Sequence, residues 1–103
     1  MKKVLSVVLA SAALIASGAA LAGDAAAGKS KYAMCMGCHG ANGVSASPAN
    51  PSIAGQDAAY VKEQLVAYKT GKRENATMKA MSAGLSDADI DNLAAHISSF
   101  PKP

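Results

Sequence analysis

The chain has 103 residues, a formal net charge of +3 and 50% hydrophobic residues, with one Phe, three Tyr and no Trp. It contains neither a basic stripe nor aromatic residues interleaved with basic ones, which argues against a nucleic-acid-binding protein. Lys2 and Lys3 lie in a segment that we expect to be removed, so eight basic residues then stand against seven acidic ones. Charge therefore does not identify a partner.

The first 22 residues have the pattern of a secretory signal peptide. Residues 1–3 are a basic start, residues 4–16 are an apolar stretch, and Ala20-Leu21-Ala22 is a small-x-small cleavage motif. A membrane anchor is the alternative, but serines and a glycine interrupt a stretch that is short for a bilayer span. We expect cleavage after residue 22, export to the bacterial periplasm and no stable membrane insertion afterwards. Residues 23–103 would then form one domain.

Three segments of the exported chain are predicted to be helical. The first is residues 24–34, rich in Ala and Lys, with its leading Asp as N-cap. The second is residues 57–68, which have a broad apolar face and are ended by Gly71. The third follows Ser86 as N-cap, places apolar residues at helical spacing and ends at Pro101.

The two segments between these helices have weaker helical patterns. Residues 40–54 contain Gly, Asn, Ser and Pro throughout and are expected to form a loop. Residues 72–84 show a less regular pattern and contain Met78 and Met81. The sequence thus predicts an all-α domain with long connections that wrap around a bound group.

The strongest motif is Cys35-Met36-Gly37-Cys38-His39, which contains both cysteines of the chain. Two cysteines separated by two residues and followed at once by histidine are typical of a c-type haem attachment site. Cys35 and Cys38 would add across the two vinyl groups of one covalently attached haem c, and His39 would bind its iron. An apolar haem would also complete the small core of a domain of this size.

Three other interpretations of the motif fit the sequence less well. A thioredoxin-like dithiol requires a βαβ context, and the sequence has no strand pattern. A zinc site requires four ligands, usually tetrahedral, and adjacent Cys38 and His39 are poor partners for one such metal. A structural disulfide would leave His39 without a role. Haem attachment is the interpretation that uses all three side chains.

A second iron ligand decides between electron transfer and chemistry at an open iron site. A methionine thioether suits haem iron and raises its reduction potential relative to a second histidine. Met34 and Met36 lie too close to the attachment turn to reach the opposite face. Met78 and Met81 lie far enough along the chain, and spacing alone does not separate them.

The exported chain resembles the class I cytochromes c over nearly its whole length. It is most similar to the small monohaem type, cytochrome c553, which is like one half of dihaem cytochrome c4. Besides the attachment motif, the resemblance rests on Pro51-Ser52-Ile53-Ala54-Gly55-Gln56, Tyr60-Val61-Lys62-Glu63-Gln64-Leu65 and Leu85-Ser86-Asp87-Ala88-Asp89-Ile90.

This resemblance implies a class I cytochrome c fold of three to five helices around one haem. It implies that Met78, seven residues before Leu85, is the second axial iron ligand and that Met81 packs against the haem. It also implies that the carbonyl of Pro51 accepts a hydrogen bond from His39, which would fix the orientation of the ring. The chain has His96 where the family commonly has Tyr, and we expect His96 to pack against the first helix rather than to bind iron.

We therefore expect a periplasmic monohaem electron carrier rather than an enzyme. Its partners would be redox proteins such as membrane respiratory complexes, oxidases or reductases, with no nucleic acid, and it would be a monomer or a weak dimer. The alternative is a haem enzyme or gas-sensing haem protein whose sixth iron ligand is exchangeable.

Overall fold

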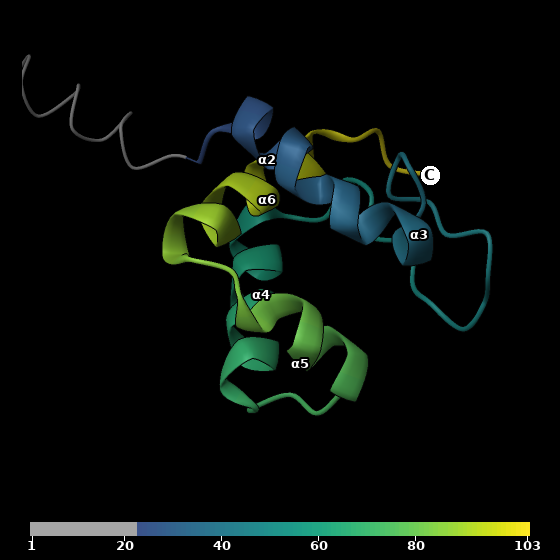
Figure 1. The fold of residues 1–103 in the computed structure, drawn as a ribbon. Helices are drawn as coiled ribbons and strands as arrows, with labels where there is room; N and C mark the ends of the chain where they lie inside the picture. The colour runs from purple at the N-terminus through teal and green to yellow at the C-terminus, as the bar shows by residue number, and fades with distance from the viewer. Residues whose placement is uncertain (1–22) are drawn as a thin grey trace, which may run out of the picture.

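A computed structural model describes residues 23–103, and the predicted signal peptide lies outside these residues. The described part is helical and contains no strand, as predicted. α2 and α6 cross at one end of the molecule, α4 leads away from them, and α5 lies beside the far end of α4 (Figure 1). The elements are α2 (Ala25–Tyr32), the 3-10 turn η1 (Ala33–Cys35), the short α3 (Met36–His39), α4 (Ala58–Thr70), α5 (Ala76–Ala83) and α6 (Asp87–Ser99).

The helix ends follow from local side-chain chemistry. The carboxylate of Asp24 accepts hydrogen bonds from the first free backbone N–H groups of α2, at 2.9 and 3.4 Å. Ser86 and Asp89 form a reciprocal capping box at the start of α6, with both hydrogen bonds at 3.0 Å. Gly71 ends α4 in the left-handed conformation at φ 81°. The predicted bounds of the first two helices are confirmed to within two residues.

Residues 72–84 have a less regular sequence pattern and were not predicted to contain a helix, but most of that range is helical. α5 covers Ala76–Ala83, and the side-chain oxygen of Asn75 caps it by accepting the backbone N–H of Met78 at 2.9 Å. Most side chains of α5 are exposed, so the helix shows little apolar pattern of its own. Its less exposed residues are those that face the cavity described below.

The core lies where α6 packs on α2 and α4. Ile90 and Leu93 are each 1% exposed, Tyr32 is 2% exposed, and the remaining members are Val61, Leu85, Ala94 and Ile97. His96 packs edge-on against Tyr32 and Phe100, with ring centroids 5.3 and 4.6 Å away. The expected packing of His96 against the first helix is therefore confirmed.

Gly28 allows the close approach of α2 and α6. A Cβ atom at this position would lie 2.0 Å from the carbonyl oxygen of Asn92 and 2.9 Å from the Cβ atom of His96. A hydrogen bond also links α2 and α6 at this crossing, because the backbone N–H of Asp24 donates to the side-chain oxygen of Asn92 at 2.8 Å. Only a residue without a side chain fits between these two helices.

We expect Gly28→Ala to destabilise the protein by about 3 kcal/mol, because overpacking against a backbone carbonyl forces the two helices apart. The measurement is the midpoint of chemical unfolding. Gly84→Ala is the matched control, since a Cβ at Gly84 meets no atom within 4 Å. A Gly28→Ala midpoint equal to that of the control would contradict the packing at this crossing.

The long loop after α3 is held by its own backbone and by α2. The carbonyl oxygen of Gly43 accepts the N–H groups of Ile53 and Ala54 at 2.7 and 3.0 Å, which brings the two ends of the loop together. The hydroxyl of Tyr32 donates to the carbonyl oxygen of Gly40 at 2.7 Å. Within residues 23–103, no helix combines the length and hydropathy that crossing a bilayer requires.

Candidate functional site

A cavity of about 350 Å³ lies between α3, the long loop, α4 and α5, with the core at its back. This volume is within the range of small-molecule and cofactor sites. Four core residues also line the cavity, namely Val61, Leu85, Leu93 and Ile97. A group bound here would therefore be continuous with the core.

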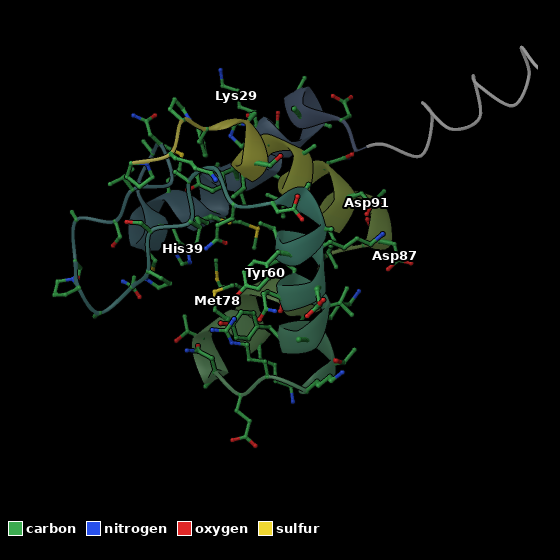
Figure 2. All side chains as sticks on the ribbon, turned by 180° about the vertical axis from the view of Figure 1, so that it is seen from behind. Lys29, His39, Tyr60, Met78, Asp87 and Asp91 are labelled. Carbon is green, nitrogen blue, oxygen red and sulfur yellow. The ribbon has the colours of Figure 1, made fainter. Side chains whose placement is uncertain are left out.

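The predicted site residues all line this one cavity. Cys35, Cys38 and His39 lie at one wall, Pro51 lies beside them in the loop, and Met78 lies on α5. Figure 2 shows that His39 and Met78 extend into the same space from separate elements, with Tyr60 of α4 nearby. The fold thus brings together residues that are about forty positions apart in the sequence.

One hydrogen bond orients the ring of His39. Its Nδ1 atom lies 2.8 Å from the carbonyl oxygen of Pro51, which is the contact that the resemblance implied. Because a carbonyl oxygen can only accept, Nδ1 carries a proton, and in the neutral tautomer Nε2 is then the nitrogen with the lone pair. His39 is only 9% exposed. The hydrogen bond therefore leaves Nε2 as the nitrogen that can bind a metal.

No disulfide joins Cys35 to Cys38, so both sulfurs are available for attachment of a group. Cys35 is half-buried, and burial together with the nearby Cys38 raises the pKa of its thiol before attachment. The carbonyl oxygen of Cys38 accepts a hydrogen bond from the hydroxyl of Ser45 at 3.2 Å, which ties the end of the motif to the loop.

Met78 is held at both of its backbone groups. Its N–H donates to the side chain of Asn75 at 2.9 Å, and its carbonyl oxygen accepts the hydroxyl proton of Ser82 at 2.6 Å. Ser82 is fully buried. Met81 also lines the cavity, one helical turn further along α5, so the lining alone does not separate the two methionines.

Sequence reasoning did not single out the polar end of the cavity. Gln64 and Tyr68 line it from α4, Arg73 and Asn75 line it from the segment that leads into α5, and Thr77 lines it from the first turn of α5. The i, i+4 spacing of Tyr60, Gln64 and Tyr68 places these three side chains on one face of α4 and was available in the sequence. The position of Arg73 could not be predicted from the sequence, because it depends on how the chain turns back after α4.

The structure does not support the other interpretations of the cysteine pair. Residues 23–103 contain no strand on which a βαβ dithiol site could be built. In the same part of the chain, no three His, Cys, Asp or Glu side chains lie close enough to hold a metal ion together. The cavity instead offers two thiols, one imidazole and thioethers around a mainly apolar space, a donor set that fits haem c.

Comparison with known proteins agrees with this donor set. Residues 25–101 match the sequence profile of the family described as Cytochrome c. The chain belongs to the cytochrome c family. It is 44% identical to cytochrome c-554(548) of Halomonas halodenitrificans, over 76% of this chain and 98% of that one. It is 45% identical to cytochrome c4 of Pseudomonas aeruginosa, over 76% of this chain and 39% of the relative.

The fold is also shared with a solved cytochrome c. The reduced recombinant cytochrome c4 from Pseudomonas stutzeri superposes with a TM-score of 0.71 at 30% identity, over 78% of this chain and 52% of the other. The chain therefore spans about half or less of the cytochromes c4 that it matches, and nearly all of cytochrome c-554(548). The protein has the class I cytochrome c fold, carries covalent haem c and is an electron-carrier haem protein.

Proposed function

We propose that this cytochrome is a periplasmic carrier of single electrons whose haem iron is bound by His39 and Met78. The observation that carries the proposal is the cavity itself. It presents the free Nε2 atom of His39 from α3 and the side chain of Met78 from α5. An iron with a protein ligand on each face has no free position for a substrate, which favours electron transfer over catalysis.

Each site residue has one task in this proposal. Cys35 and Cys38 would hold the haem covalently through two thioether bonds, each made by adding an S–H group, sulfur and proton together, across one vinyl group. The carbonyl of Pro51 keeps the proton of His39 on Nδ1, so that Nε2 binds the iron. Met78 supplies a thioether sulfur that favours the reduced state. The haem supplies the reversible exchange of one electron.

Contact with redox partners would take place around the attachment segment. Met34 and Met36, in η1 and α3, are 39% and 43% exposed, although large apolar side chains are usually buried. Small exposed residues extend this surface, and a small apolar interface suits brief encounters. The other exposed residues assigned to it are Ala33, Gly37, Ala41 and Ala80.

The location and partners complete the proposal. A signal peptide at residues 1–22 would export the chain to the periplasm, where covalent haem attachment takes place. The carrier would then move electrons between membrane respiratory complexes, oxidases or reductases. It would work as a monomer or a weak dimer, because a transient carrier must separate from each partner.

The test is spectroscopy of the full chain made in a bacterium that matures c-type cytochromes. We expect haem in the periplasmic fraction, a weak long-wavelength thioether-to-iron charge-transfer band in the oxidised protein and slow binding of CO to the reduced protein. Absence of the band with rapid CO binding would contradict the carrier proposal. That result would favour a haem enzyme or gas sensor with an exchangeable ligand.

A further inference from the structure

The cavity has a single lining side chain with a permanent charge. Among the described residues that line it there is no Asp, Glu or Lys, and the only Arg is Arg73. The nearby Lys69 and Lys72 do not line the cavity. Lys69 donates instead to the backbone carbonyl oxygen of Leu85. One cation thus stands at the polar end of a mainly apolar space.

Arg73 is held in place by three contacts with α4. Its backbone N–H donates to the carbonyl oxygen of Ala67 at 3.0 Å. Its Nη1 atom donates to the side-chain oxygen of Gln64 at 2.5 Å. Its Cζ atom lies 4.8 Å from the centroid of the Tyr68 ring, within the range of a cation–π contact. The guanidinium is therefore positioned by neutral groups that also line the cavity.

No carboxylate in the described part of the chain pairs with Arg73. The ion pairs within residues 23–103 join Lys31 to Asp89 at 3.5 Å and Lys62 to Asp91 at 2.8 Å, on the α6 side of the molecule. A guanidinium has five N–H donors in a planar fork that matches a carboxylate. The single side-chain hydrogen bond to Gln64 leaves most of these donors available to a ligand.

We propose that Arg73 binds a propionate carboxylate of the haem and thereby raises the reduction potential of the iron. The inference rests on the proposed function, in which the haem is attached at Cys35 and Cys38. Haem c carries two propionates, and among the cavity-lining residues of the described range 23–103 only Arg73 offers them a fixed positive charge. Asn75 and Thr77, which line the cavity beside it, can donate further hydrogen bonds.

The effect on potential follows from electrostatics. Arg73 neutralises a negative charge close to the iron, and without it that charge stabilises the ferric state. The side chain is exposed on its outer side, so water screens part of the interaction. The effect is therefore expected to be moderate, but larger than that of a lysine that does not face the haem.

The test compares Arg73→Gln with Lys72→Gln in the haem-loaded protein. Both changes remove one positive charge from neighbouring exposed positions, and only Arg73 lines the cavity. We expect Arg73→Gln to lower the equilibrium constant for reduction about fivefold, because one positive charge near the iron is lost while water screens part of its effect. Lys72→Gln should change it much less. The propionate bending band in resonance Raman spectra should shift in Arg73→Gln and stay unchanged in Lys72→Gln.

Equal changes of potential in the two variants, with no Raman shift in either, would overturn the proposal. If Arg73→Gln does not accumulate with haem, Arg73→Lys serves instead. It keeps the charge but loses the planar fork, so its Raman band should shift, and an unshifted band would overturn the proposal. The thioether-to-iron band of the wild-type protein tests the iron ligands separately. If the wild type lacks this band, binding of the iron by Met78 is contradicted, but the propionate band still tests the role of Arg73.

Discussion

Replacing both Cys35 and Cys38 with alanine is expected to leave the exported chain without haem and largely unfolded. The reason lies in the size of the core. A domain of about 80 residues buries only a marginal apolar core on its own. Here a wall of that core faces the cavity, and Val61 and Leu93 belong to both. Without a bound group, the partly buried Ile53 and Leu65, which line the cavity and pack against the core, would stay in contact with water.

Far-ultraviolet circular dichroism and haem staining of a denaturing gel measure the two effects. We expect the double variant to lose covalent haem completely and to lose most of its helical signal. Gly37→Ala is the matched control within the same motif, because a Cβ at Gly37 meets no atom within 4 Å. Gly37→Ala should keep its covalent haem and its helical signal. A colourless double variant with the helix content of the wild type would show that the chain folds without haem.

The attachment motif and the helix ends could be predicted because they depend on residues close together in the sequence. Cys35, Cys38 and His39 lie within one turn, and the caps at Asp24 and Ser86 act on backbone groups two or three residues away. Such local chemistry is the same in any fold. The all-α class followed from it directly.

α5 was not predicted, because its apolar residues are organised by the cavity rather than by a stripe of its own. Asn75 as a cap and Gly84 just after the helix were the local features that indicated its bounds. The contacts of Arg73 were harder to predict from the sequence. They depend on the segment after Gly71 turning back along α4, which brings Arg73 over a ring five residues earlier.

Met78→Ala is expected to abolish the thioether-to-iron charge-transfer band and to let CO bind rapidly to the reduced protein. It should also lower the equilibrium constant for reduction by more than about tenfold, or 59 mV for a one-electron couple. The cause is loss of the soft ligand that stabilises ferrous iron. Optical spectra, a potentiometric titration and CO-binding kinetics give the three measurements.

Met81→Ala is the control that decides between the two methionines. It removes the same side chain from the same helix, at a position that also lines the cavity. The side chains of Asn75 and the buried Ser82 hold the two backbone groups of Met78. A ligand fixed in this way moves little when iron changes its charge, as fast electron transfer requires. We therefore expect Met81→Ala to keep the band and to reduce stability only, by about 2–3 kcal/mol for a truncated apolar side chain. Loss of the band in Met81→Ala, with retention in Met78→Ala, would transfer the ligand role to Met81.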